Sequence, residues 1–174
     1  MIPTKKKEYY FMGEYNSREE KVAALLKEHD LKVTTAESCT GGLIAGTLVN
    51  VSGISGQFEE GYITYSNEAK ERLLGVSHET LEKFGAVSEE TAKEMALGAR
   101  LKAGADISII STGIAGPDGG TAEKPVGLVY LGCAFGEQVK VERHIFPGNR
   151  WEVRHASTQA ALQLLEKVMT EDEI

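Results

Sequence analysis

The sequence has 174 residues, with 19 basic and 26 acidic side chains and a formal net charge of −7. This length suits one sizeable hydrophobic core rather than two. An acidic surface repels the phosphate backbone of nucleic acids, so nucleic acid is not an expected partner. No segment approaches the ~18 consecutive apolar residues of a membrane span, so a membrane is not expected either. We therefore predict a single domain over residues 16–174, preceded by an extension over residues 1–15.

The two cysteines, Cys39 and Cys133, lie far apart and outside any CxxC spacing. This pattern indicates neither a disulfide framework nor a zinc site and is typical of the reducing cytoplasm. The four histidines are also scattered without the spacing of metal ligands. We therefore expect a cytoplasmic protein that uses no metal and no cofactor.

Hydrophobic periodicity predicts alternating helices and strands in chain order. The first helix, over 17–29, opens with Ser17 and Glu20 in capping-box spacing. Asn67 is a plausible cap for a short helix further on. The predicted elements are a strand of about five residues within 31–37, a buried helix within 40–51, a strand over 58–66, helices over 67–76 and 88–103, strands over 106–112, 126–135 and 140–146, and a last helix over 149–169.

This order of elements predicts an α/β fold, a three-layer α/β/α sandwich around a mostly parallel, mixed sheet. The strands over 126–135 and 140–146 are close enough in sequence to pair as a hairpin, which makes the sheet mixed. Ligands of such sheets gather at the carboxyl ends of the strands. The loops containing Ser38 and Thr112 follow two of these ends, so they are the candidate sites.

The segment ESCTGG, residues 37–42, combines a hydroxyl group with features of an anion site. Gly41 and Gly42 remove side chains that would block approach, and a helix that begins there presents unpaired N–H groups. Ser38 is then a candidate nucleophile beside an oxyanion hole. The alternative is that Ser38 or Thr40 only caps the helix.

A nucleophilic serine needs a base, and no histidine lies beside a candidate nucleophile. Lysine can replace histidine when burial disfavours its charged form. Lys70 is the candidate because it lies in the first turn of a predicted helix, where the helix dipole also disfavours a cation. The alternative is a solvated surface lysine.

Two further segments are candidates for phosphate binding. TGIAGPDGG, residues 112–120, is either a phosphate cradle or a plain turn, and Lys124 beyond it is either a phosphate partner or a solvated charge. Arg150 and Arg154 lie four residues apart on one predicted helical face. Their guanidinium groups either clamp a phosphate or carboxylate or pair with the many acidic side chains.

Five segments occur together in an order that resembles the CinA carboxy-terminal domain family of nicotinamide-nucleotide amidases: AESCTGG, YSNEAK, GAVSEETAKEMA, TGIAGPDGGTAEKPVG and FPGNRWEVR. The resemblance covers about residues 17–168. It implies hydrolysis of the carboxamide of nicotinamide mononucleotide to nicotinic acid mononucleotide and ammonia. The family's separate amino-terminal domain has no counterpart here, so the stand-alone form of the amidase is expected, and family resemblance also implies a homodimer.

The resemblance also implies roles for individual residues. Ser38 corresponds to the nucleophile, Lys70 to its base, and Tyr65 to a residue that orients the lysine or relays the proton. Backbone N–H groups near Thr40 to Gly42 would hold the oxyanion. The positions implied to bind substrate are Thr40, Gly41, Gly42, Asn67, Thr112, Gly113 and Arg150, with Arg150 suited to the phosphate.

Two other functions are open on the residues alone. Cys39 lies next to Ser38, and as a nucleophile it would make the protein a cysteine hydrolase. The chain would otherwise be a catalytically silent ligand-binding or regulatory module that binds a nucleotide without releasing ammonia.

Overall fold

The computed structural model describes residues 17–171, so the predicted extension over residues 1–15 lies outside the described residues. The helices are α1 (Arg18–Glu28), α2 (Leu43–Val49), α3 (Asn67–Leu74), α4 (His78–Phe84), α5 (Glu89–Ala103) and α6 (Arg150–Glu171), with one 3₁₀ turn, η1 (Ile54–Gly56). The strands are β1 (Val33–Glu37), β2 (Phe58–Ile63), β3 (Ile107–Gly113), β4 (Leu128–Phe135) and β5 (Gln138–Ile145). None of the helices within these residues combines the length and apolar character needed to span a bilayer.

The five strands form one mixed sheet in the order β2-β1-β3-β4-β5. β1 pairs in parallel with both β2 and β3, whereas β4 is antiparallel to β3 and to β5. Four of the five strands therefore run in the same direction, and only β4 is reversed. The predicted α/β fold with a mixed sheet and a closing hairpin is confirmed.

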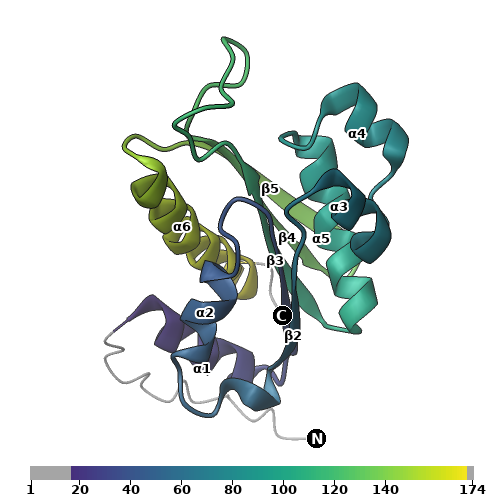
Figure 1. Ribbon diagram of the computed structural model, residues 1–174. Coiled ribbons are helices and arrows are strands. Elements are labelled where there is room, and N and C mark those ends of the chain that lie inside the picture. The colour runs from purple at the N-terminus through teal and green to yellow at the C-terminus, as the bar shows by residue number, and fades with distance from the viewer. Residues whose placement is uncertain (1–16, 172–174) are drawn as a thin grey trace, which may run out of the picture.

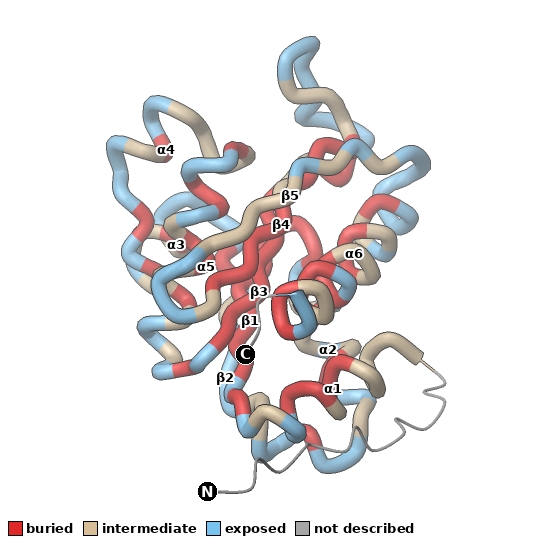
Figure 2. The backbone as a smooth tube through the Cα atoms, turned by 180° about the vertical axis from the view of Figure 1, so that it is seen from behind, coloured by how far each residue is buried: buried red, intermediate tan, exposed pale blue. Residues whose placement is uncertain are grey.

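Helices cover both faces of the sheet, as the three-layer prediction requires (Figure 1). One apolar cluster joins the sheet to α1, α2 and α6, and a second joins the opposite face to α3, α4 and α5. The burial pattern follows these layers: β1 is buried throughout, whereas the edge strand β2 is mostly exposed (Figure 2). Helices cover β1 on both faces, so all five residues of its VTTAE segment are buried.

The helix boundaries follow the predicted ones closely, with two differences. Ser17 caps α1 as predicted, but the cap of α3 is Ser66, whose hydroxyl accepts the N–H of Ala69, and Asn67 is the first helical residue. The sequence analysis did not predict α4, a seven-residue helix with Leu81 as its one buried residue. A helix this short offers too few apolar positions to establish a period.

The shared direction of four strands places several loops at one edge of the sheet. The segments after β1, β2, β3 and β5 all leave from carboxyl ends, and the long loop over 114–127 projects beyond this edge (Figure 1). Ligands of open α/β sheets bind at this edge. The fold therefore brings together the segments that carry Ser38, Lys70, Thr112 and Arg150.

Helix α3, which carries Lys70, is held by a close contact with α5. A Cβ atom built on Gly98 of α5 would overlap the carbonyl oxygen of Leu74 at the end of α3. A glycine within a helix costs about 1 kcal/mol relative to alanine, so this position retains it for close packing. This contact allows α3 and α5 to approach closely.

We predict that Gly98→Ala lowers the free energy of unfolding by about 2 kcal/mol or more, because the backbone of α3 must shift to admit one methyl group. The matched control is Gly46→Ala in α2, an exposed helical glycine with nothing within 4 Å of the added Cβ. The control should gain about 0.5 kcal/mol from helix propensity. Urea denaturation measures both values, and equal effects of the two substitutions would refute the close contact.

Candidate active site

Ser38 lies directly beyond the carboxyl end of β1 and is almost fully buried, with 8% of its surface exposed. Its backbone N–H donates to the carbonyl oxygen of Ser111 in β3, at 3.0 Å. This bond continues the parallel pairing of β1 with β3 by one residue. The position of the Ser38 hydroxyl is therefore set by the centre of the sheet rather than by a mobile loop.

Lys70 lies in α3, the helix that follows β2, and its side chain extends to Ser38. Its ammonium nitrogen, Nζ, lies 3.2 Å from the Oγ atom of Ser38 and donates to the carbonyl oxygen of Thr64 at 3.0 Å. The side chain is among the largest fully buried ones, with 1% of its surface exposed. Burial lowers the pKa of Lys70 below its ordinary value of 10.5. The predicted pair of a hydroxyl and a buried amine is therefore present, and the solvated-surface alternative for Lys70 is wrong.

Cys39, the neighbour of Ser38, is also buried. Burial raises the pKa of its thiol to about 11. The thiolate, not the thiol, is the nucleophilic form, so Cys39 is protonated and inert at neutral pH. These surroundings favour Ser38 over Cys39 as the nucleophile.

The start of α2 differs from the prediction. The helix begins at Leu43, and its cap residue is Gly42 in a left-handed conformation, so neither Ser38 nor Thr40 caps it. The buried carboxylate of Glu37 accepts the N–H groups of Gly42, Ile44 and Ala45 at 2.8–3.0 Å. The orphan donors of the helix are therefore occupied by the protein's own anion.

This occupation changes the set of possible oxyanion donors. The N–H of Gly42 is bonded to Glu37 and that of Gly41 to the carbonyl oxygen of Ser38, at 3.2 Å. Within residues 17–171, the N–H of Thr40 is the one amide of the three that makes no hydrogen bond to the protein. The predicted oxyanion hole over Thr40 to Gly42 is thereby narrowed to the Thr40 end.

A chain of hydroxyl groups lies beneath this turn. The Oγ1 atom of Thr40 donates to the Glu37 carboxylate at 2.6 Å and lies 2.7 Å from the Oγ atom of Ser111. The one hydroxyl hydrogen of Thr40 is donated to the carboxylate, so Ser111 is the donor in the second hydrogen bond. Thr112 points to the opposite face of β3, as strand alternation requires, and donates to the carbonyl oxygen of Ala86. Ser111 is thus the residue of β3 that contacts Thr40, whereas Thr112, a predicted substrate-binding position, lies on the other face of the strand.

Tyr65 does not contact Lys70 in the described structure. Its side chain is 63% exposed, and its hydroxyl accepts a hydrogen bond from a guanidinium nitrogen of Arg150 at 2.9 Å. Arg150 also donates to the carbonyl oxygen of Gly116 at 2.8 Å. The carbonyl group of Thr64 holds the amine instead, and Tyr65 and Arg150 form a polar pair between two loops of the sheet edge.

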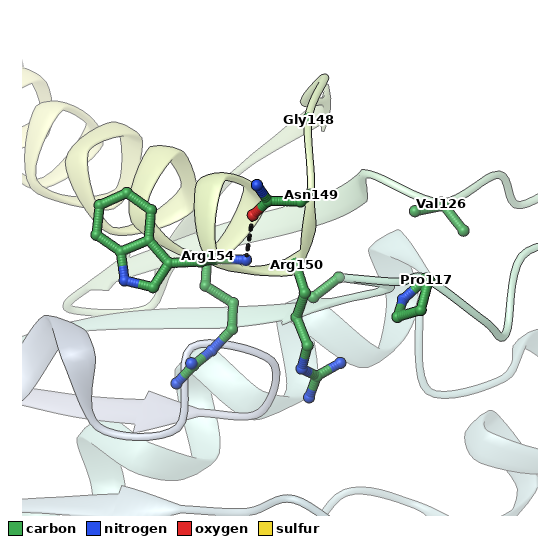
Figure 3. Close-up of a pocket in the computed structure, with 8 residues that line it drawn as sticks. Pro117, Val126, Gly148, Asn149, Arg150 and Arg154 are labelled. Carbon is green, nitrogen blue, oxygen red and sulfur yellow. Dashed lines mark hydrogen bonds between the residues drawn. The ribbon is translucent and has the colours of Figure 1, made fainter.

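A pocket of about 660 Å³ adjoins these groups at the start of α6 (Figure 3). Asn149 caps this helix by accepting the N–H groups of Trp151 and Glu152. Arg150 and Arg154, one turn apart, point to the same side (Figure 3). The pocket is lined by Ala115, Pro117, Val126, Gly148, Asn149, Arg150, Trp151 and Arg154. Ser38 and Lys70 are not among its walls, so the pocket lies beside the hydroxyl and amine pair rather than over it.

The other candidate residues are Asn67, Gly113 and Lys124, and each has a different local setting. Asn67 is exposed at the first position of α3. A Cβ on Gly113 would crowd the backbone of Leu128 and Val129, so this glycine allows β3 and β4 to close up. Lys124 donates to the carbonyl oxygen of Phe84 at 2.6 Å, and thus ties the long loop to the end of α4. Residues 17–171 contain no group of three His, Cys, Asp or Glu side chains that would hold a metal ion.

Two functional positions were not assigned from the sequence. The sequence analysis gave Glu37 no role of its own. An acidic residue shortly before a helix start is nevertheless a signal that its carboxylate caps the helix. For Arg154 the sequence leaves two roles open, a clamp for a phosphate or carboxylate and a partner of acidic side chains. In the structure its Nε and Nη2 atoms donate to the carbonyl oxygens of Cys39 and Thr40, at 3.0 and 2.9 Å. No sequence pattern indicated this contact, which spans more than 110 residues.

Residues 15–169 match the family model of the CinA C-terminal domain. The chain belongs to this family. A putative competence-damage inducible protein of Clostridium beijerinckii is 53% identical over 151 residues, which are 87% of this chain and 37% of that protein. A CinA-like protein of Kosmotoga olearia is 52% identical over 160 residues, 92% of this chain and 39% of that protein. The chain thus spans about two fifths of the length of these curated relatives.

Solved structures of the CinA superfamily share the fold. One from Klebsiella pneumoniae aligns with a TM-score of 0.85 at 35% identity, covering 90% of this chain and 99% of that chain. A competence/damage inducible protein from Agrobacterium tumefaciens aligns with a TM-score of 0.80 at 43% identity, covering 88% and 97%. The resemblance inferred from five short segments is therefore confirmed at the level of the family and its fold.

The lowered pKa of Lys70 predicts how stability depends on pH. Between the lowered pKa of the folded state and 10.5, the unfolded chain binds the proton and the folded chain does not. The free energy of unfolding contributed by this residue therefore rises as the pH rises through that window, and a fixed penalty remains below it. Lys70→Met removes the penalty, so its melting temperature at pH 7 should exceed that of the wild type by about 3 °C.

Thermal unfolding of both proteins from pH 7 to 10 tests this expectation. The difference in melting temperature should shrink towards pH 10. Lys102→Met, which replaces an exposed lysine of α5, is the control and should follow the wild type at every pH. A Lys70→Met protein less stable than the wild type at pH 7 would show that the buried amine stabilises the fold.

Proposed function

We propose that this member of the CinA C-terminal domain family hydrolyses the carboxamide of nicotinamide mononucleotide, releasing nicotinic acid mononucleotide and ammonia. The observation that carries the proposal is the 3.2 Å contact between the buried Lys70 amine and the Ser38 hydroxyl. The family resemblance supplies the substrate. The predicted single amidase domain, homodimer and cytoplasmic location stay predictions.

The geometry supports a two-step acyl transfer. The neutral amine of Lys70 accepts the Ser38 proton while Oγ attacks the amide carbon, and a tetrahedral oxyanion forms. The C–N bond then breaks, and Lys70 returns the proton to the leaving ammonia. Water attacks the resulting ester in the same way, with Lys70 again taking a proton, and nicotinic acid mononucleotide leaves as Ser38 regains its hydrogen.

The surroundings of Lys70 suit this role. A base works best when its pKa lies near the operating pH, and burial moves the pKa of Lys70 in that direction. The carbonyl oxygen of Thr64 accepts one amine hydrogen, which orients the lone pair. Such a base does not need a histidine or a metal beside it.

The pocket at the start of α6 supports the assignment of the remaining part of the substrate. Its volume of about 660 Å³ is within the usual range for small-molecule sites. Arg150 forms part of its wall, and the bidentate guanidinium group suits a phosphate. With the phosphate at Arg150, the ribose would cross the rim and the pyridinium carboxamide would approach Ser38. The pyridinium charge would draw electrons from the carbonyl carbon.

We predict that Ser38→Ala and Lys70→Ala each lower the rate of ammonia release from nicotinamide mononucleotide by about 10³-fold or more, because each removes a member of one catalytic unit. Cys39→Ala should retain activity within about threefold, since its thiol is protonated. A coupled ammonia assay measures the rates. Mass spectrometry of the quenched wild type should find the acyl group of nicotinic acid mononucleotide on the peptide that contains Ser38.

Different outcomes distinguish the alternatives. An active Ser38→Ala protein combined with an inactive Cys39→Ala protein would establish a cysteine hydrolase. Calorimetric binding of the nucleotide by a wild-type protein that releases no ammonia would establish the catalytically silent module.

A further inference from the structure

Arg154 donates hydrogen bonds to two successive backbone carbonyl groups directly after Ser38. Its Nε atom donates to the carbonyl oxygen of Cys39 and its Nη2 atom to that of Thr40, so one planar guanidinium group spans two successive carbonyl groups. The guanidinium group also lies beside Gly41, because a Cβ on that glycine would lie 3.4 Å from Nη2. These are the two residues that directly follow Ser38.

The two arginines at the start of α6 therefore do different work. Arg150 donates to Gly116 and to an exposed tyrosine hydroxyl at the rim. Arg154 lies one turn deeper and is half-buried, and its donors are directed to the turn after β1 (Figure 3). Two N–H groups of Arg154 are taken by backbone carbonyl oxygens beside Ser38, whereas two of Arg150 are taken by the Gly116 carbonyl oxygen and the Tyr65 hydroxyl.

We propose that Arg154 is a positioning residue for Ser38, acting through the backbone of Cys39 and Thr40. The segment from Ser38 to Gly42 is neither strand nor helix, and Gly41 and Gly42 have positive φ values of 60° and 103°. Such a segment has no regular ladder of its own to hold it. Arg154 ties its carbonyl groups to α6, while Glu37 ties the following N–H groups to β1.

The contact also affects the N–H of Thr40. The carbonyl group of Cys39 and the N–H of Thr40 belong to the same peptide unit. A charged donor on the carbonyl oxygen polarises that unit and strengthens its N–H as a donor. Arg154 thus fixes the direction of Ser38 Oγ and prepares the Thr40 N–H for the oxyanion, a role that rests on the proposed amidase function.

Kinetics of Arg154→Ala with nicotinamide mononucleotide test the proposal. We expect kcat to fall about 10- to 100-fold, less than or equal to the loss of one direct oxyanion donor, and KM to change by less than about threefold. Arg154→Lys should retain only part of kcat, because one ammonium group cannot reproduce both hydrogen bonds of the planar guanidinium group. Added guanidinium at about 20 mM should restore part of kcat in Arg154→Ala and none in Ser38→Ala. Arg150→Ala is the matched comparison and should mainly raise KM.

A second readout does not require activity. Amide hydrogen exchange in peptides covering residues 38–45 should be at least several-fold faster in Arg154→Ala than in the wild type, with residues 107–113 of β3 unchanged. Faster exchange in Arg154→Ala, combined with a wild type that releases no ammonia, would refute the amidase function but support the positioning role. A raised KM with kcat intact would identify Arg154 as a substrate ligand and overturn the proposal. Unchanged exchange over 38–45 would overturn it as well.

Discussion

The burial of one lysine side chain is the constraint on which the site depends. A buried ammonium group is costly unless it is paired or loses its proton, and no carboxylate among the described residues forms a hydrogen bond with Lys70. Its two partners are neutral oxygens, the Ser38 hydroxyl and the Thr64 carbonyl. Folding therefore favours the free amine, and the same interaction that makes Lys70 a poor stabiliser makes it a proton acceptor. The parallel pairing of β1 with β2 brings the ends of both strands, and hence both groups, to one edge of the sheet.

Alternation and periodicity were enough to predict the layers and the hairpin, whereas the pairing of Lys70 with Ser38 was implied by the family resemblance. They were not enough for the phase of side chains at the edge. Ser111 and Thr112 are adjacent and chemically similar. Only the register of β3 against β1 decides that Ser111 contacts the segment from Ser38 to Gly42, here called the nucleophile turn. The partners of Tyr65 and Arg154 depend on contacts across 85 and 115 residues, which a local pattern cannot contain.

The nucleophile turn is held by two opposite charges that act on opposite ends of the peptide dipole. Glu37 accepts N–H groups at the start of α2, and Arg154 donates to the carbonyl groups that precede it. Each charge is satisfied by backbone partners rather than by the other, so neither is neutralised by a salt bridge that would relax the turn. This arrangement explains how a five-residue irregular segment with two left-handed glycines stays ordered without a helix or strand of its own. It also explains why the helix start is not itself an anion site.

Part of the cost of the site falls on Thr64. Its N–H donates to the Glu37 carbonyl and its carbonyl oxygen accepts the Lys70 amine, whereas its buried hydroxyl has no hydrogen-bond partner among the described residues. An unsatisfied buried hydroxyl costs about 1–3 kcal/mol. The backbone of Thr64 thus joins the end of β1 to the base, and the position tolerates an unfavourable side chain. Unfavourable local choices gather where function competes with stability, and here the orphan hydroxyl and the buried amine of Lys70 meet at one residue.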